Sequence, residues 1–452
     1  MQQNDTARMG TENIMKLMLQ FSLPSTVGMV VMATYNIMDT FFIGMLGSEA
    51  IAALTVAHPI QMLLGSVAIG TGVGAASLIS RSLGSGDNEE AEKALGQVIG
   101  LSIIYSIIVF VGGLFVLEPI LVMAGATPEI LPLAWEYIIV ITSGSIMFFL
   151  LMGLNNVLRA EGSPILSMKV MIVSAVVNII LDPIFIFLFG LGVQGAAVAT
   201  VLAKVAGIII IFWRFLGPNS VLKLRLKNIK PTVKTVLEIY RIGVPAMVLP
   251  FSINISHMVA NSILAGYGHV PVAVMGLFFR LQMLAIMPAI GFKQGLLPLI
   301  GYNYGAGYND RIREVLVKGV GISTLFITVF GAAYFISPGF FLGLFTTDPE
   351  LLELGTGALR IMVIMFPLLG LHNMASVYFQ AVGKGLPSLF LSLLREAMLF
   401  IPIVLLLSNI YGLEGVWFSR PLSDFLAFIV TGILVLWEFK LQKQFSIKRN
   451  QA

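Results

Sequence analysis

The sequence predicts an all-α integral membrane protein with twelve transmembrane helices in two parallel six-helix repeats. Three observations predict this fold class: the composition, the number of long apolar segments, and a repeat that relates the two halves of the chain. Of the 452 residues, 57% are hydrophobic and only 11% are charged. Soluble domains have about 25% charged residues. Too few polar side chains are present to cover a water-facing surface, so we expect lipid to surround most of the chain.

The apolar segments are long enough to cross a bilayer, which takes roughly 20 residues of helix. Cutting the chain at charge clusters and at Gly, Pro and Asn turns predicts spans at 15–46, 51–80, 94–117, 130–153, 165–189, 194–215, 236–266, 271–302, 314–337, 351–380, 387–409 and 415–439. The expected organisation is an N-terminal six-helix bundle at 1–216, a basic linker at 217–235, a C-terminal six-helix bundle at 236–440 and a tail at 441–452.

The positive charges support this count. Most of the 27 Lys and Arg residues lie in or beside the loops after even-numbered spans, or near the two termini, whereas the loops after odd-numbered spans contain none. This asymmetry follows the positive-inside rule and predicts a plasma-membrane protein with both termini in the cytoplasm. The linker alternates apolar and basic residues over 221–227. It is either a solvated connector or a strip that rests on anionic lipid headgroups.

The two halves align with each other when the sequence is shifted by 221 positions. Pro24 then meets Pro245, and 12 of the 28 positions in 61–88 are identical to their counterparts in 282–309. Because each repeat has six spans, both repeats enter the membrane in the same orientation. Parallel repeats of this kind are typical of secondary transporters, whose substrate sites lie where the repeats meet.

Several classes of chemistry are excluded by the residues themselves. The chain has no cysteine, and its four histidines are scattered without the spacing of a metal site. The glycine-rich segment 70–74 lies inside an apolar span and has no preceding strand, so it does not fit a nucleotide-binding loop. We therefore expect no enzyme activity, no cofactor and no ATP hydrolysis. The modest net charge of +4 does not indicate nucleic-acid binding.

The sequence resembles the MATE (multidrug and toxic compound extrusion) transporter family, and within it the MepA-like branch. Six segments in chain order account for this resemblance. They are residues 35–40, 156–162, 178–183, 192–200, 294–306 and 412–417. Together they cover both halves of the chain.

The resemblance implies a V-shaped pair of six-helix bundles around a central cavity. It also implies a secondary antiporter that exports small amphipathic or cationic organic compounds, driven by entry of protons, sodium or both. We expect a functional monomer that contacts membrane lipids and small-molecule substrates. Two other functions are considered: a flippase for a lipid-linked precursor and, with less support, an ion channel. The flippase predicts extra spans and a strongly basic cavity, and the channel predicts repeated selectivity elements; neither set is evident.

Polar residues at membrane depth in the first half predict a cation-binding site. An ionisable side chain inside a span costs a few kcal/mol of insertion free energy and usually has a function. Asp39 lies past the middle of span one, Asp182 in span five with Asn178 one helical turn before it, and Thr200 in span six. Two carboxylates, an amide and a hydroxyl suit an alkali cation or a proton. The alternative is structural: Asp39 caps a broken helix, and Asp182 satisfies backbone groups freed by Pro183.

The second half is expected to differ from the first. Ala260 occupies the position equivalent to Asp39. NorM-like members of the resembled family have acidic coupling residues in this half, so the substitution places coupling in the first half. Charged residues in or near the spans of this half predict either an internal ion-pair network or a polar cavity wall. They are Arg280, Lys293, Arg360, Arg395, Glu396, Arg420 and Asp424. Neighbouring Arg395 and Glu396 point to different helix faces and need not pair with each other.

Two further expectations concern prolines at repeat-equivalent positions and the residues that line the substrate cavity. Pro24 and Pro245 each remove a backbone hydrogen bond, so a bend is expected in the first helix of both halves. Methionine is flexible and suits a binder of varied compounds. We expect the substrate cavity to be lined by Met32, Tyr35, Asn155, Asn156, Gln282, Met283 and Met287.

Overall fold

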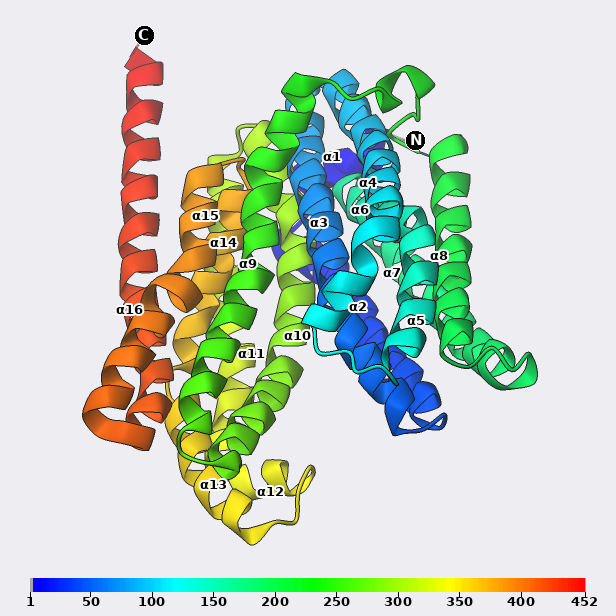
Figure 1. Ribbon diagram of the computed structural model, residues 1–452. Helices are drawn as coiled ribbons and strands as arrows, with labels where there is room; N and C mark the ends of the chain where they lie inside the picture. Colours follow the sequence, from blue (N-terminus) through cyan, green and yellow to red (C-terminus); the bar gives the residue numbers. More distant parts are fainter. Residues whose placement is uncertain (1–2, 219, 452) are drawn as a thin grey trace. The chain divides into compact units, whose positions relative to one another are not determined.

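The computed structural model describes residues 3–218 and 220–451, with side chains for residues 6–218 and 220–440. Among the described residues every regular element is a helix, as Figure 1 shows. The all-helical prediction is therefore confirmed.

The first part of the chain forms α1 (Gln3–Thr11), α2 (Ile14–Gly44), α3 (Ser48–Ser85), α4 (Asn88–Met123), α5 (Leu131–Ser143), α6 (Ser145–Ala160), α7 (Pro164–Pro183), the π-helix η1 (Ile184–Leu188), α8 (Gly192–Leu216) and the 3₁₀ helix η2 (Leu226–Ile229). The remainder forms α9 (Val233–Ala265), α10 (His269–Gly305), α11 (Asn309–Ile336), α12 (Pro338–Gly343), α13 (Pro349–Val363), the 3₁₀ helix η3 (Phe366–Leu368), α14 (Leu369–Ala381), α15 (Gly385–Leu393), the π-helix η4 (Leu394–Phe400) and α16 (Ile401–Gln451). The short helices α1 and α12 were not anticipated from the sequence.

Ten helical segments of the described chain are long and apolar enough to cross a membrane. The pair α5 and α6, bent by 54°, adds an eleventh span. The last of the ten, Gly385–Lys440, has 56 residues, far more than the roughly 20 that one crossing needs. It is interrupted at Gly412, whose φ of 61° and ψ of −136° are not helical. Division at Gly412 gives the twelve crossings that the sequence predicts.

The chain forms two compact units. Unit 1 comprises Met1–Met247, Gln294–Ile312 and Gln380–Lys384, and unit 2 comprises Val248–Lys293, Arg313–Phe379 and Gly385–Ala452. Unit 1 has an apolar core on α2, α3, α5 and α8 that includes Ile43, Ala57, Ile138 and Ala197. The core of unit 2 includes Phe278, Phe366 and Trp417.

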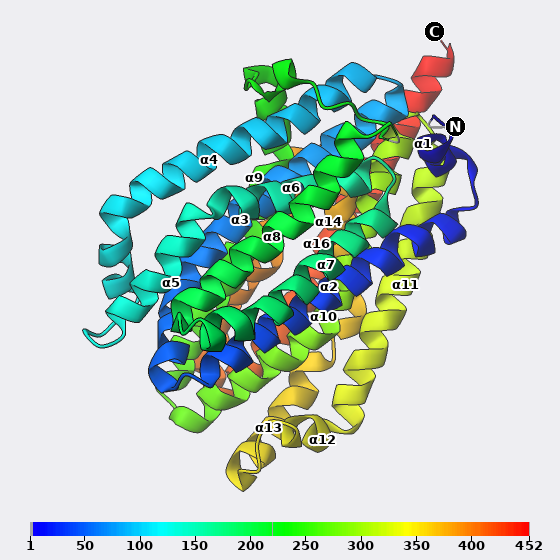
Figure 2. The ribbon, with the colours of Figure 1, turned by 90° about the vertical axis from the view of Figure 1, so that its right-hand side faces the viewer.

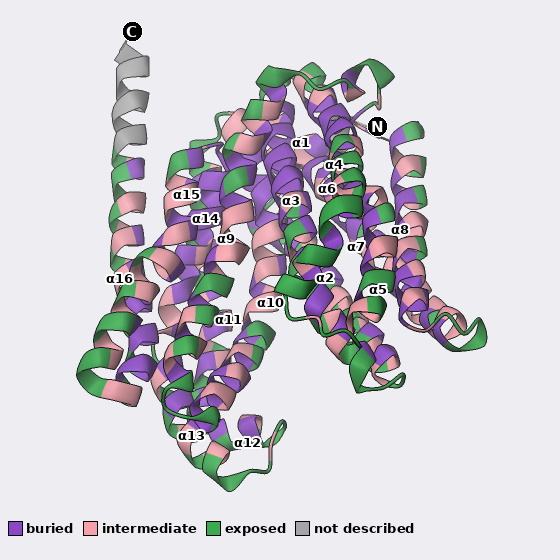
Figure 3. Ribbon diagram, in the orientation of Figure 1, coloured by how far each residue is buried: buried purple, intermediate pink, exposed green. Residues whose placement is uncertain are grey.

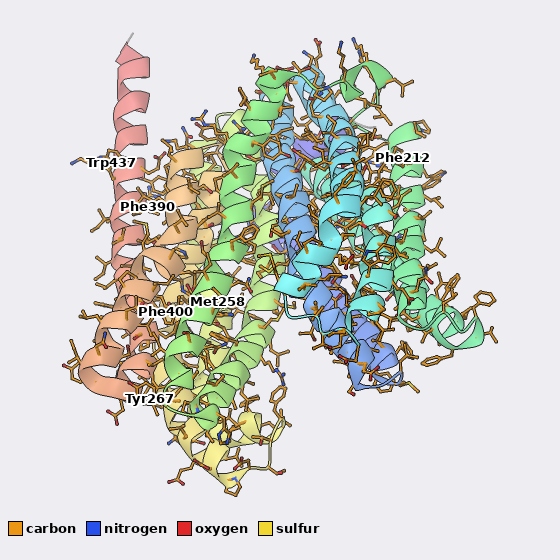
Figure 4. All side chains as sticks on the ribbon, viewed as in Figure 1. Phe212, Met258, Tyr267, Phe390, Phe400 and Trp437 are labelled. Carbon is orange, nitrogen blue, oxygen red and sulfur yellow. The ribbon has the colours of Figure 1, made fainter. Side chains whose placement is uncertain are left out.

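Large apolar side chains cover the outside of the helices, as expected for contact with lipid. Phe115 is 77% exposed and Met123 88% exposed. Figure 3 shows exposed residues on the outer helix faces, and Figure 4 shows Trp437 on α16, where its side chain is 60% exposed. Water-soluble proteins rarely expose such continuous apolar surface.

Two glycines at repeat-equivalent positions allow a close approach inside unit 1. A Cβ atom on Gly84 of α3 would lie 2.0 Å from the carbonyl oxygen of Tyr302, and one on Gly305 of α10 would lie 2.0 Å from that of Arg81. Position 81 is equivalent to 302 and position 84 to 305, so the two contacts are the same contact seen from each repeat. Only glycine permits backbones this close.

The basic linker is attached to α4 rather than free along its whole length. The Nε2 atom of Gln97 donates to the carbonyl oxygens of Asn228 at 2.7 Å and Lys230 at 3.0 Å, and its Oε1 accepts from the amide of Thr232 at 2.8 Å. Arg225 also forms an ion pair with Glu92 at 2.7 Å. A buried glutamine thus satisfies backbone groups that no helix satisfies.

The topology makes a labelling prediction. Single cysteines at Ser85 or Asn309 should react with an impermeant maleimide only from the cytoplasm, and those at Ser48, Thr127 or Thr347 only from outside. All five positions are exposed, and the chain has no native cysteine to obscure the result. The check is labelling of intact cells compared with inverted membrane vesicles. One position that reacts from the wrong side would contradict the twelve-span topology.

Candidate functional site

Three helices of unit 1 bring together the polar residues predicted for cation binding. Asp39 lies on α2, Asn178 and Asp182 lie on α7, and Thr200 lies on α8. α7 packs against both α2 and α8, and the three helices run side by side in Figure 2. All four side chains are buried, none more than 8% exposed.

Small residues explain how α7 and α8 come so close at this depth. A Cβ atom on Gly195 of α8 would lie 2.6 Å from the backbone of Phe185 in η1, which directly follows α7, and one on Gly207 would lie 2.3 Å from the Oγ atom of Ser174 on α7. These two glycines lie on either side of Thr200 along α8. Small residues at helix contacts permit such close packing in membrane proteins, and here they place Thr200 within reach of α7.

Asn178 connects the polar side chains of α7 and α8. Its Nδ2 atom donates to Oδ1 of Asp182 at 3.0 Å and to Oγ1 of Thr200 at 3.4 Å. Asn178 and Asp182 are four residues apart and therefore lie on one face of the helix. Asp39 is close enough to Asp182 for the two carboxylates to repel each other.

Three oxygen atoms of this cluster lack a hydrogen-bond donor among the described residues. They are Oδ1 of Asp39, Oδ1 of Asn178 and Oδ2 of Asp182, and all are buried. Buried polar atoms nearly always have a partner. Carboxylate and amide oxygens are hard ligands of the kind that alkali and alkaline-earth cations prefer, and a carboxylate also accepts a proton. The cluster therefore has the chemistry of a site for a small cation.

The structural alternative for these residues finds little support in the geometry. α2 runs without interruption from Ile14 to Gly44, so Asp39 does not cap a break. Asp182 does precede Pro183, where α7 gives way to the π-helix η1, but its Oδ1 accepts from a side chain. π-helical turns inside helices are frequent at functional sites.

Lys204 belongs to the same site and was not identified from the sequence. It lies one turn after Thr200 on α8 and is only 7% exposed. Its Nζ atom donates to the carbonyl oxygen of Thr200 at 3.5 Å and lies 5.3 Å from the ring centroid of Phe148. Its charge interacts with Asp39 and, less strongly, with Asp182. An ionisable residue inside a span was the available signal, the same one that identified the two aspartates.

A cavity of about 40 Å³ adjoins the cluster. Its lining residues are Met32, Tyr35, Leu151, Met152, Asn155, Met171, Ser174, Ala175, Asn178, Thr200, Ala203 and Lys204. By this measure one water molecule needs about 10–15 Å³, so the volume suits an ion with a few water molecules and is small for an organic compound.

The predicted substrate residues divide into three groups. Met32, Tyr35 and Asn155 line this cavity. Asn156 does not; its Nδ2 donates to the carbonyl oxygen of Met152 at 2.8 Å and its Oδ1 accepts from Arg159 at 2.7 Å. The other three, Gln282, Met283 and Met287, lie on the part of α10 that belongs to unit 2.

Comparison with known proteins identifies the family. The MatE family model matches residues 24–184 and, a second time, residues 245–406. The chain belongs to the MatE family. The two matches fall in the two halves of the chain, which confirms the repeat seen in the sequence.

Relatives and solved structures in this family match over nearly the whole chain. Multidrug export protein MepA from Staphylococcus aureus (strain NCTC 8325 / PS 47) is 31% identical over 424 residues, which cover 93% of each chain. An outward-facing structure of a multidrug resistance MATE family transporter of the MOP superfamily matches with a TM-score of 0.90 at 27% identity, covering 97% of this chain and 98% of the other. A MATE crystal structure in the bent conformation matches with a TM-score of 0.92 at 27% identity, covering 98% and 99%.

The MatE repeat in unit 2 has different chemistry at the equivalent depth. Ala260, the counterpart of Asp39, is fully buried in the apolar core. Charged residues gather instead around η4. Glu396 accepts from both terminal nitrogens of Arg420 at 2.9 Å, and Arg395 donates to Asp424 at 2.7 Å. The charged residues for which the sequence allows either an ion-pair network or a polar cavity wall are joined by ion pairs in the structure.

One detail of the network differs from the sequence-based expectation. Arg395 and Glu396, expected on different helix faces, form a hydrogen-bonded ion pair at 3.2 Å. Both lie in the π-helical turn Leu394–Phe400, which is wider than an α-turn and changes the direction of its side chains. The long guanidinium of Arg395 thereby reaches both Glu396 and Asp424.

This network predicts a stability effect in the second unit. Asp424→Asn should destabilise the protein by about 3 kcal/mol, because removing one partner leaves the other charge buried. Glu353→Gln changes an exposed carboxylate of the same unit and should be neutral. Thermal unfolding of both purified variants in detergent measures the difference. An Asp424→Asn protein with the melting temperature of wild type would show that the network is not structural.

Proposed function

We propose that this protein is a cation-coupled secondary antiporter that exports small amphipathic or cationic organic compounds. In this proposal Asp39, Asn178, Asp182 and Thr200 bind the coupling cation, a proton or sodium. The observation that supports it most directly is the group of three buried oxygens without a donor among the described residues. A relative 31% identical over most of the chain is described as a multidrug export protein.

The coupling step follows from the cost of burying charge. Two carboxylates close together in an apolar bundle cannot both remain ionised cheaply without a cation. Either sodium, held by oxygens of all four residues, or a proton on a carboxylate relieves the repulsion. Occupation by one makes the site unfavourable for the other. Entry of the cation from outside then favours release of the organic compound.

The proposed direction of transport depends on the orientation in the membrane. The distribution of basic residues supports an orientation with both termini in the cytoplasm of a plasma-membrane protein. The cation gradient across that membrane is directed inward, so an exchanger moves its substrate outward. We infer export for this reason.

The organic substrate needs more space than the cavity provides in this conformation. Met32, Met152 and Met171 line it, and methionine side chains repack readily. We propose that movement of these side chains, with Tyr35 and Asn155 as polar contacts, opens the cavity toward the substrate. Gln282, Met283 and Met287 are proposed contributions from the second half.

Removing either carboxylate should abolish coupling without unfolding the protein. Asp39→Asn and Asp182→Asn preserve side-chain size but lose the charge that a cation neutralises. In proteoliposomes with proton and sodium gradients imposed separately, ethidium efflux by either variant should fall to the level of protein-free vesicles. Asp310→Asn, an exposed aspartate outside the site, serves as the matched control and should transport normally. A folded Asp39→Asn protein with normal gradient-driven efflux would refute the assignment.

Thr200 should distinguish sodium from the proton. A protonated carboxyl has little need of a hydroxyl ligand, whereas sodium loses one of its oxygens. Thr200→Ala should weaken sodium binding roughly tenfold, the equivalent of one lost polar contact, and affect proton-driven efflux much less. Thr55→Ala, which removes an exposed hydroxyl bonded to its own helix at 2.9 Å, is the control.

The same measurement tests whether the two cations share the site. Sodium affinity of wild type should be lower at acidic than at alkaline pH, because protons compete for the same carboxylates. Sodium binding that is independent of pH, or unchanged in Thr200→Ala, would contradict a shared site.

A further inference from the structure

Lys204 places a third charge beside the two carboxylates of the proposed cation site. Its side chain lines the same cavity as Asn178 and Thr200 and is 7% exposed. The ammonium group is stabilised on two sides, by the carbonyl oxygen of Thr200 at 3.5 Å and by the face of Phe148, whose centroid is 5.3 Å away. An aromatic face attracts a cation most strongly when water is excluded.

The charges of the site can be counted from the described residues. Asp39 and Asp182 contribute two negative charges when ionised, and Lys204 contributes one positive charge. Lys204 is the positively charged side chain that acts on both carboxylates. The site without a bound ion thus has a net charge of minus one. Without Lys204 the net charge would be minus two.

The net charge limits how many cations the site accepts. A cluster surrounded by apolar side chains is most stable when its charges cancel. A site of net charge minus one is neutralised by a single monovalent cation, and a second cation would leave an excess positive charge. The lysine amine is fixed to α8 by its own side chain, so it cannot leave the site with the transported ions.

We propose that Lys204 is a built-in counter-ion that restricts the transporter to one coupling cation per cycle. This inference rests on the proposed antiport function and specifies its stoichiometry. One cation is then exchanged for one monocationic substrate molecule, and no net charge crosses the membrane. A lysine with only a structural role, bonded to Thr200 and packed on Phe148, would have no effect on this ratio.

The test is the voltage dependence of transport by reconstituted protein. Ethidium, a permanent monocation, is allowed to reach its steady distribution in proteoliposomes under whichever cation gradient drives wild type. A potassium diffusion potential with valinomycin is then imposed. With wild-type protein, the ratio of internal to external ethidium should change no more than it does in protein-free vesicles. Lys204→Met should exchange two cations for each ethidium, so that one net charge crosses the membrane per cycle. The ethidium ratio should then change roughly 50-fold per 100 mV.

Control variants distinguish the effect of the Lys204 charge from an effect on the structure. Lys204→Arg keeps the positive charge and should remain voltage-independent. Lys293→Met removes another lysine of the membrane-spanning helices. Lys293 lies on the part of α10 that belongs to unit 2, and transport by this variant should also be independent of voltage. If Lys204→Met does not fold, Lys204→Gln replaces it. For a folded variant that does not transport, equilibrium binding of the driving cation to purified protein should rise from one to two per chain.

The outcomes distinguish this inference from the proposed function. Wild type without efflux under either gradient would refute the antiport function itself. Wild type that transports with one net charge per ethidium would refute the counter-ion role alone. A folded Lys204→Met protein with wild-type voltage dependence, or with one bound cation, would also overturn it.

Discussion

The cost of placing two carboxylates inside a bundle surrounded by lipid is the constraint on which the rest of the structure depends. Asp182 is completely buried and Asp39 nearly so. Neither charge is tolerated at this depth without compensation. Asn178 donates to one carboxylate, Lys204 supplies a positive charge, and three oxygens remain without a donor among the described residues. The site is therefore partly but not fully compensated, which is the condition for exchanging a cation.

The helices achieve this arrangement through their contrasting faces. Their outer faces bear large apolar side chains such as Phe115 and Met123. Their inner faces include glycines, and Gly195 and Gly207 let α8 approach α7 closely enough for Thr200 to reach Asn178. Because lipid is as apolar as the outer side chains, close packing and polar contacts hold these helices together. The packing that stabilises unit 1 is thus also the packing that assembles the site.

The sequence predicted the fold class well because its signals are regular. Span length, basic loops and the repeat each follow from simple physical rules, and even the break at Gly412 was expected as a boundary between spans. The polar cluster of α2, α7 and α8 could be predicted from polar residues at similar depth. Lys204 lies inside the predicted span 194–215, but nothing in the sequence indicates that its amine lies near Asp39 and Asp182, which are on other helices. The Arg395–Glu396 pair was missed because nothing in a sequence marks the π-helical turn of η4. Helix packing also decides which face of α6 meets the cavity. Asn155 lines the cavity for this reason, whereas the neighbouring Asn156 is hydrogen-bonded to Arg159.

The two repeats use buried charge in opposite ways. In unit 2, Arg395 and Arg420 match Glu396 and Asp424 in number, and the pairs lie at hydrogen-bond distance. Such a cluster is neutral as it stands and gains nothing from a further ion. In the cluster of unit 1, two aspartates face one lysine, and three acceptor oxygens have no donor among the described residues. Two domains descended from one repeat can therefore share an architecture while only one has a reason to bind a cation. The difference lies in a single unit of charge, which helix packing alone does not determine.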